Sequence, residues 1–373
     1  MIPRHFPEID TPRISYWLDE IQSSFPNSLT FVLLPESEKN RVSDIQKLFN
    51  DRDQVLLGAI FPALITDAGF STSGASFLCF PQQLCHFLAD DLDIDSADAA
   101  SRIANILVKQ TPSQDHQENQ QLFLVFDSML SNTGSILTHL FDHLNHRFVY
   151  TGVNAGSETF QAMPCLFDNH RLVSNGVIGL VLDDSMQFAL QHSYPVSKPL
   201  MRASSTAGNR IDKIDGLPAM SVYQRVIASE FGITLTPENF YDYAVHYPFG
   251  LVGTLEILVR IPVAFNDDGS IFCVGEVPAN SMLRLLKAPM LADSNCVSKL
   301  VELIGHDREA PLLAFYCAGR RMHFGDEATG ELRTLLEKSG ATSIIGALSL
   351  GEISTDNELG IPQFHNAAML CSR

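Results

Sequence analysis

The sequence predicts a mixed α/β (α+β) fold in two domains, with mixed, partly antiparallel sheets covered by helices. Segments with apolar residues at helical spacing alternate along the chain with short apolar runs that are typical of buried strands. Two connections between strands look like hairpins, which favours mixed sheets over a purely parallel sheet. The length of 373 residues exceeds that of one ordinary core and indicates two domains.

The first half of the chain is predicted to alternate helices with strands. Asp95 or Ser96 fits the N-cap of a helix whose apolar face ends near Leu107. Two apolar runs within 177–190 flank Asp183-Asp184-Ser185, a turn sequence that predicts a hairpin. Further helices are expected at 14–25, 43–50 and 136–144, strands at 29–34, 54–61 and 122–126, and a polar surface loop at 111–121.

The second half is predicted to begin after a loop-like stretch at 193–218 that contains three prolines and two glycines. This composition places the domain boundary there and gives two domains, 1–215 and 216–373. Helices are expected at 219–230 and 327–338, and strands at 251–261, 271–274, 311–317, 344–350 and 364–370.

Composition excludes several classes of function. The net charge is −18 and the pI about 4.9, so the surface would repel nucleic acid and anionic membranes. Seven cysteines without a CxxC pair indicate a reducing compartment. No apolar run approaches the roughly 18 residues that span a bilayer, and the N-terminus lacks the apolar segment of a signal peptide. We therefore expect a cytoplasmic protein without direct membrane insertion.

Motifs of common enzymes are missing from the sequence. It has no GxGxxG, GxxxxGK[ST], GxSxG or HExxH pattern, and the closest match, 152–156, reads as a tight structural turn. His139, His143 and His146 have helical spacing that could hold zinc, but their polar neighbours favour an ordinary surface helix. Cys317 follows an apolar strand, which favours a buried structural thiol over a nucleophile. No catalytic residue is predicted, and we expect a protein that is not an enzyme.

Several segments together resemble the FIST family, a two-part sensory domain of bacterial signalling proteins. The resemblance extends from about residue 30 to the last predicted strand, and its strength lies in the order and spacing of the matches. They are Gly58-Ala59-Ile60-Phe61-Pro62, Gly152 to Ser157, Asn209 to Tyr223, Tyr247-Pro248-Phe249-Gly250, Val259 to Pro262, Gly346 to Ile353 and Phe364-His365-Asn366.

The resemblance implies a sensor rather than a catalyst. One branch of the family is freestanding, like this chain, binds haem b and senses nitric oxide. It acts through a partner histidine kinase or a cyclic-di-GMP enzyme, and a homodimer is possible. The alternative is a FIST sensor that binds a small metabolite, such as an amino acid, without haem.

A haem b iron needs an axial ligand, usually a neutral histidine, beside an apolar slot. His192 is the predicted metal ligand because it follows an apolar strand and falls where many family members carry a HGW triplet, here His192-Ser193-Tyr194. His365 and His246 are the alternatives. The remaining cofactor-binding candidates are aromatic residues for the slot and arginines for the haem propionates, namely Tyr194, Tyr247, Phe249, Arg202 and Arg260.

Overall fold

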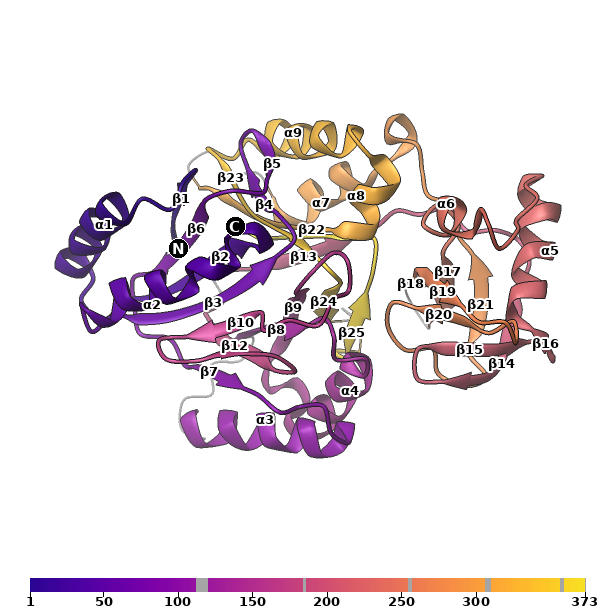
Figure 1. The fold of residues 1–373 in the computed structure, drawn as a ribbon, viewed down its shortest axis with the longest axis horizontal. Helices are drawn as coiled ribbons and strands as arrows, with labels where there is room; N and C mark the ends of the chain where they lie inside the picture. Colours follow the sequence, from indigo (N-terminus) through magenta and orange to yellow (C-terminus); the bar gives the residue numbers. More distant parts are fainter. Residues whose placement is uncertain (112–119, 184–185, 254–256, 306–309, 356–358, 373) are drawn as a thin grey trace.

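The computed structural model describes residues 1–111, 120–183, 186–253, 257–305, 310–355 and 359–372. Figure 1 shows a large body, formed by residues 1–191 and 291–372, and a smaller lobe, formed by residues 201–285, to one side of it. Two short segments, 192–200 and 286–290, join the lobe to the body, and we call them the hinge segments. The chain thus leaves the body once and returns to it, so both ends of the sequence build the body.

The body contains three sheets that share one core. The first sheet has the strand order β1-β6-β2-β3-β10-β11, and the second has β25-β24-β9-β8-β12-β7. The third has β13-β26-β22-β23-β4-β5. Each sheet contains one parallel pair among antiparallel strands: β2 with β3, β8 with β9, and β22 with β23. Apolar side chains from all three sheets meet in a single cluster.

The strands of the body are short, as is usual for sheets of this kind. In the first half they are β1 (Ile2–Phe6), β2 (Leu29–Pro35), β3 (Val55–Phe61), β4 (Leu64–Thr66), β5 (Gly69–Ser71), β6 (Ala75–Phe80), β7 (His86–Ala89), β8 (Gln121–Asp127), β9 (Val149–Ala155), β10 (Leu166–Asp168), β11 (Leu172–Val173), β12 (Val177–Leu182) and β13 (Phe188–Gln191). The returning chain adds β22 (Leu312–Cys317), β23 (Ile344–Ser349), β24 (Glu352–Thr355), β25 (Pro362–His365) and β26 (Met369–Ser372).

Helices cover the outer faces of these sheets. The body helices are α1 (Thr11–Ser24), α2 (Val42–Asn50), α3 (Ser96–Gln110), α4 (Thr133–Leu144), α7 (Cys296–Ile304), α8 (Ala318–Phe324) and α9 (Glu327–Ser339), with short 3₁₀ turns at Glu36–Arg41, Asn145–Arg147 and Leu291–Asp293. Helices α3 and α4 pack on the second sheet, and α7, α8 and α9 pack on the third. Among the described residues, no helix combines the length and the apolar composition that crossing a membrane requires.

The lobe is a separate sheet with its own core. Its strand order is β18-β17-β21-β14-β15-β20-β19, with β16 paired to β15. Helices α5 (Ala219–Phe231) and α6 (Phe240–Ala244) contribute to a core that the lobe does not share with the body. The strands are β14 (Met201–Ala207), β15 (Arg210–Ile214), β16 (Leu217–Pro218), β17 (Phe249–Val252), β18 (Ile257–Arg260), β19 (Pro262–Phe265), β20 (Ile271–Cys273) and β21 (Met282–Leu285).

The predicted mixed α/β class with helices over partly antiparallel sheets is confirmed, and strongly periodic segments lie close to their predicted positions. Asp95 caps α3 by accepting a hydrogen bond from the backbone of Ala97, as the sequence predicted. The predicted hairpin at 177–190 is wrong, because β12 pairs with β7 and β8 whereas β13 pairs with β26. Most of the predicted loop at 111–121 lies outside the described residues.

The sheets join segments that are far apart in the sequence. Strand β4 pairs with β23, and β9 pairs with β24, so the last strands complete sheets that the first half begins. The predicted boundary after residue 215 falls in the turn between β15 and β16, inside the lobe. The spatial division into body and lobe is therefore set by the hinge segments.

Candidate ligand-binding site

A pocket of about 260 Å³ lies between the body and the lobe. On the body side it meets the ends of β22 and β23, where Cys317 and Leu350 stand, and the first turn of α8. Ligands of α/β proteins commonly bind at the carboxyl ends of parallel strands, and this pocket has that position. The lobe contributes mainly apolar side chains. The lining residues that the argument uses are Phe160, Ile261, Val263, Val274, Met322 and Asn366.

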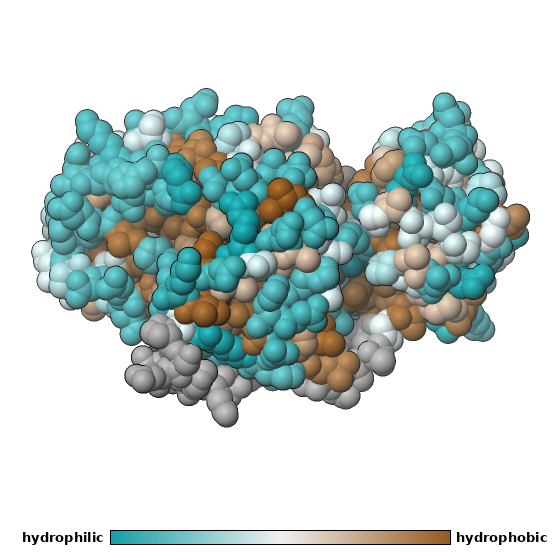
Figure 2. Space-filling view, turned by 90° about the horizontal axis from the view of Figure 1, so that it is seen from below, coloured by the Kyte–Doolittle hydropathy of each residue, from teal (hydrophilic) through white to brown (hydrophobic). Residues whose placement is uncertain are grey.

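A second pocket of about 190 Å³ adjoins the first. The two share Phe160, Val263 and Val274 as a common wall. The second pocket lies at the ends of the parallel strands β8 and β9, where Ser128 and Asn154 line it. Figure 2 shows body and lobe joined through a narrow waist with hydrophobic atoms beside it. The two pockets together form a partly apolar cleft between the body and the lobe.

Three polar side chains in the cleft have atoms without a protein partner. Asn366, which is 1% exposed, has no hydrogen-bond partner for Nδ2 or for Oδ1. In the adjoining pocket, Oδ1 of Asn154 and Oγ of Ser128 are also buried and unpaired. Native proteins pair nearly all buried polar groups, since an unpaired one costs about 1–3 kcal/mol. Such a group in the wall of a pocket is suited to a ligand.

Glycines allow the backbone to form this cleft. Gly156 follows β9 with φ +138°, and a Cβ there would lie 2.5 Å from Oγ of Ser128. Gly275 has φ +83°, and its Cβ would lie 2.9 Å from the ring of Phe364. Both positions favour glycine because side chains rarely tolerate these angles. Gly275 lines the second pocket, so a side chain there would also take up space in it.

Few charges face the cleft. Glu158 is the one charged residue among those that line the two pockets in the described parts of the chain, and Arg321 lies 3.9 Å from it. Glu352, buried beneath Cys317, accepts a hydrogen bond from Ser349 at 2.6 Å. Burial raises the pKa of Glu352 to about 8, so this carboxyl is protonated at neutral pH.

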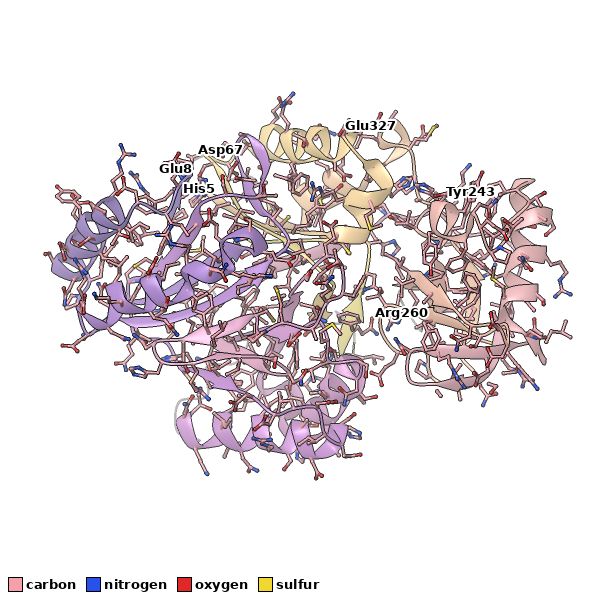
Figure 3. All side chains as sticks on the ribbon, in the orientation of Figure 1. His5, Glu8, Asp67, Tyr243, Arg260 and Glu327 are labelled. Carbon is pink, nitrogen blue, oxygen red and sulfur yellow. The ribbon has the colours of Figure 1, made fainter. Side chains whose placement is uncertain are left out.

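Direct contacts hold the lobe on the body. Glu276 of the lobe accepts hydrogen bonds from the backbone N–H and the hydroxyl of Ser135, at 2.7 and 2.6 Å, in the first turn of α4. Arg260 donates to the carbonyl of Phe364 at 3.0 Å and to that of Glu276 at 2.8 Å. Figure 3 labels Arg260 on the face of the lobe that is turned towards the body. These contacts tie the lobe to α4 and to β25 of the body.

The hinge segments pair with each other where they cross between body and lobe. Val196 and Leu286 form an isolated antiparallel bridge, and the N–H of Lys287 donates to the carbonyl of Pro195. Buried Arg320 anchors the first segment to the body by donating to the carbonyl of His192 at 2.9 Å. Arg320 is itself held by two hydrogen bonds to Glu331, at 2.6 and 2.9 Å. Domain hinges consist of a few loop or element-terminal residues, and these two short segments have that position.

The structure places His192 at the start of the first hinge segment, directly after β13. Its Nδ1 accepts a hydrogen bond from the N–H of Tyr194, so Nε2 carries the proton and donates to the carbonyl of Ile257, both at 3.0 Å. Burial lowers the pKa of His192 to about 4, which keeps the ring neutral. Both ring nitrogens are therefore used in holding the hinge.

Haem does not fit this arrangement of His192. An iron ligand must offer a free nitrogen lone pair, and here the lone pair of Nδ1 already accepts a hydrogen bond from Tyr194 while Nε2 carries the ring proton. His192 does not line the pocket between body and lobe. The volume of that pocket, about 260 Å³, is also below the roughly 300–1,000 Å³ that is typical of pockets for drug-sized ligands. A haem is larger than most such ligands.

Each of the two alternative histidines makes a hydrogen bond through one ring nitrogen. Nδ1 of His246 lies 2.7 Å from Nδ1 of His323, whose Nε2 donates to the carbonyl of Pro289. This pair joins the lobe to α8. His365 is buried with Nε2 3.0 Å from the hydroxyl of Ser354, while its Nδ1 has no partner. Burial lowers the pKa of His365 to about 3. Within the described residues, no cluster of three or more metal-binding side chains is found.

The other predicted cofactor residues are not gathered at one place. Tyr194 packs against His192 and His323 in the small cluster between body and lobe. Phe249 is in the lobe core, where its ring centroid lies 5.0 Å from that of Tyr223, and Tyr247 packs on Phe231. Arg202 is exposed on β14. Arg260, also of the predicted set, contacts Phe364 and lines a further pocket of about 560 Å³, which shares Phe364 with the second pocket of the cleft.

The polar groups of the cleft were not singled out from the sequence. Asn154 and Asn366 both fall in segments that carry the family resemblance. A motif match does not distinguish a residue that binds a ligand from one that only packs in the fold. Ser128 and Glu276 have no local signal, because their roles depend on partners more than 100 residues away or across the cleft. A signal that could have found Asn366 is its place between two buried residues immediately after a strand.

Family models identify the chain. The FIST N domain matches residues 29–217, and the FIST C domain matches residues 219–355. The first of these alone covers half of the chain, so the protein belongs to the FIST family. FIST domains are sensory domains that bind small ligands, and the cleft is a site of the right kind for such a ligand. No curated protein matches the chain.

Proposed function

We propose that this protein is a sensor whose small ligand binds in the cleft between body and lobe and changes the position of the lobe. The observation that carries the proposal is the cleft itself, a partly apolar pocket with unpaired buried amide groups, adjacent to a two-segment hinge. A ligand that contacts both parts binds the closed arrangement more tightly than the open one. It therefore shifts the equilibrium between them.

A partner protein would read the position of the lobe. The resemblance predicts a histidine kinase or a cyclic-di-GMP enzyme in this role. The acidic composition, with a net charge of −18, favours a protein partner over nucleic acid. A sensor of this kind works without turnover, because the ligand acts only through its different affinity for the two arrangements.

Haem b with nitric oxide as the sensed gas stays a prediction from the resemblance, and the metabolite-type sensor is the function we favour. The reason is the hydrogen bonding of His192, in which both ring nitrogens have backbone partners. The absorption spectrum of the ferrous protein after haem reconstitution, with and without nitric oxide, tests the difference. A stoichiometric Soret band that His192→Ala removes would contradict our preference, and no specific band is the expected result.

Toluene is a suitable first probe of the cleft, because an apolar cavity of about 150 Å³ takes up benzene. We expect toluene to raise the melting temperature of the wild type and of Leu217→Trp, a control on the exposed surface of the lobe. Val263→Trp fills the wall that the two pockets share and should abolish the effect. An equal response in Val263→Trp would overturn the cleft as the binding site.

Movement of the lobe can be measured with spin labels at Tyr16→Cys on the body and Leu217→Cys on the lobe, both exposed positions. Cys85, which is partly exposed, is replaced by serine, while the remaining cysteines are buried. Double electron–electron resonance should show a change in the distribution of distances between the two spin labels when toluene saturates the protein. Binding without any change would overturn sensing by lobe movement.

A further inference from the structure

Asn366 is the polar residue of the cleft with the most unpaired atoms, since both its amide nitrogen and its amide oxygen lack a hydrogen-bond partner. It is one residue beyond β25, between buried His365 and Ala367, and both of its amide atoms lack partners. A carboxamide presents a donor and an acceptor side by side. The group that pairs both atoms at once carries an acceptor and an N–H donor in the same arrangement, as an amide, a lactam or a urea does.

The charges around the cleft are already used by the protein. Arg260 donates to the carbonyls of Val259, Glu276 and Phe364. Arg320 is paired with Glu331 and is fully buried. Among the described residues that line the two pockets no cation is found, so a ligand carboxylate would lose its hydration without a partner.

The second pocket offers further polar groups of the same neutral kind. Oδ1 of Asn154 and Oγ of Ser128 are unpaired there, and the shared wall of Phe160, Val263 and Val274 is apolar. With volumes of about 260 and 190 Å³, the two pockets have room for a molecule of one or two rings, since about 150 Å³ is enough for benzene. The unpaired polar groups at both ends are neutral, and Glu158, the charged residue of the lining in the described parts of the chain, lies 3.9 Å from Arg321.

We infer that the cleft binds a small uncharged molecule with an amide- or lactam-type edge, which pairs with the carboxamide of Asn366 while its apolar part lies against Ile261, Val263 and Met322. This inference rests on the proposed function and narrows the class of its ligand. It disfavours free amino acids and other carboxylates as ligands of this site.

Four probes of similar size separate the possibilities: benzamide, benzoate, benzylamine and toluene. In titrations followed by ligand-observed NMR, benzamide should bind the wild type about tenfold more tightly than toluene, equivalent to about 1.4 kcal/mol. Benzoate should bind more weakly than toluene. In Asn366→Leu the advantage of benzamide over toluene should disappear, while toluene itself still binds.

The matched control is Asn169→Leu, an asparagine far from the cleft whose side chain is fully paired with Asn50, Gln54 and Leu56. This variant should leave the preference for benzamide unchanged. If Asn366→Leu does not fold, Asn366→Asp serves instead, and it should weaken benzamide and strengthen benzylamine.

The outcomes distinguish the two levels of the account. If toluene binds in the cleft but benzoate binds as tightly as benzamide, or if Asn366→Leu leaves the benzamide preference intact, the ligand class is overturned and the proposed function stands. If none of the probes binds and Val263→Trp behaves like the wild type, the cleft as a ligand site is overturned as well.

Discussion

Nitrogen-bearing side chains on the two sides of the junction between body and lobe differ in how far their hydrogen bonds are satisfied. On the hinge side, His192 and Arg320 use their nitrogens in hydrogen bonds that join one part of the fold to another. On the cleft side, Asn366 and Asn154 are buried and have unpaired atoms. The first hinge segment also has buried hydroxyls without a partner, on Ser193, Tyr194 and Ser197, but none of these residues lines the two pockets of the cleft. Paired nitrogens indicate a structural joint, and an unpaired polar group in the wall of a pocket indicates a site that can take a ligand.

The largest expected effect is at the hinge. Arg320→Met removes the buried counter-ion of Glu331 and leaves its carboxylate charge uncompensated, although the hydroxyl of Tyr316 still donates to it. We expect a loss of about 3–5 kcal/mol in the free energy of unfolding, measured by urea denaturation. The double variant Arg320→Met with Glu331→Met should recover most of the loss. A single variant as stable as the wild type would mean that the hinge does not depend on this pair.

Acid should weaken the same side of the junction. Burial lowers the pKa of His192 to about 4 and that of His365 to about 3, so the folded state binds fewer protons than the unfolded state below pH 6.5. Stability is therefore full above about pH 6.5 and falls as the pH drops towards 4, by up to about 1.4 kcal/mol per pH unit for each histidine. Urea unfolding between pH 7 and 5 measures this slope.

His192→Gln should flatten the acid slope, and the exposed His170→Gln is the matched control that should leave it unchanged. If His192→Gln retains the full slope, the neutral ring of His192 is not what acid disrupts.

Raising the pH should reduce the stability of the protein through Glu352, which is buried beneath Cys317 in the body. Burial raises the pKa of Glu352 to about 8, so its stabilising proton is present at low pH and is lost as the pH rises towards and beyond 8. In the wild type we expect the free energy of unfolding to decrease by roughly 1 kcal/mol between pH 7 and 8.5, and in Glu352→Gln we expect this decrease to be absent. Calorimetric melting at the two pH values measures it, and an identical decrease in the variant would place the titrating group elsewhere.

The smallest effect has the opposite sign. Asn366→Leu replaces an unpaired buried amide with an apolar group of similar size, so it should stabilise the free protein by about 1 kcal/mol. Asn169→Leu, which removes three hydrogen bonds, should destabilise it. Urea unfolding of both variants compares them directly. A loss of stability in Asn366→Leu would show that this amide is paired in solution.

Local patterns in the sequence predicted the elements but not their partners. The periodic apolar residues of α1, α3 and α5 and the apolar runs of β2, β3 and β8 were sufficient to place them. The hairpin at 177–190 failed because a short apolar run does not reveal which strand it pairs with, and β13 finds its partner about 180 residues later. Sheets assembled from both ends of a chain cannot be read from neighbouring residues.

The candidate site was visible only in part for the same reason. His192 lies at a strand end as predicted, but its hydrogen bond to the carbonyl of Ile257, 65 residues away, decides what its ring can do. Asn366 was quoted within a motif, whereas its unpaired amide is a property of its surroundings in the fold. Residue type and spacing indicate where a residue lies along a strand or within a motif, but they do not reveal its hydrogen-bond partners in the fold.

The most direct test of the central claim is a crystal structure of the protein soaked with benzamide. The account predicts benzamide in the cleft, with its amide within hydrogen-bond distance of Nδ2 and Oδ1 of Asn366 and its ring against Val263. Benzamide bound elsewhere, or a haem ligated by His192, would contradict it.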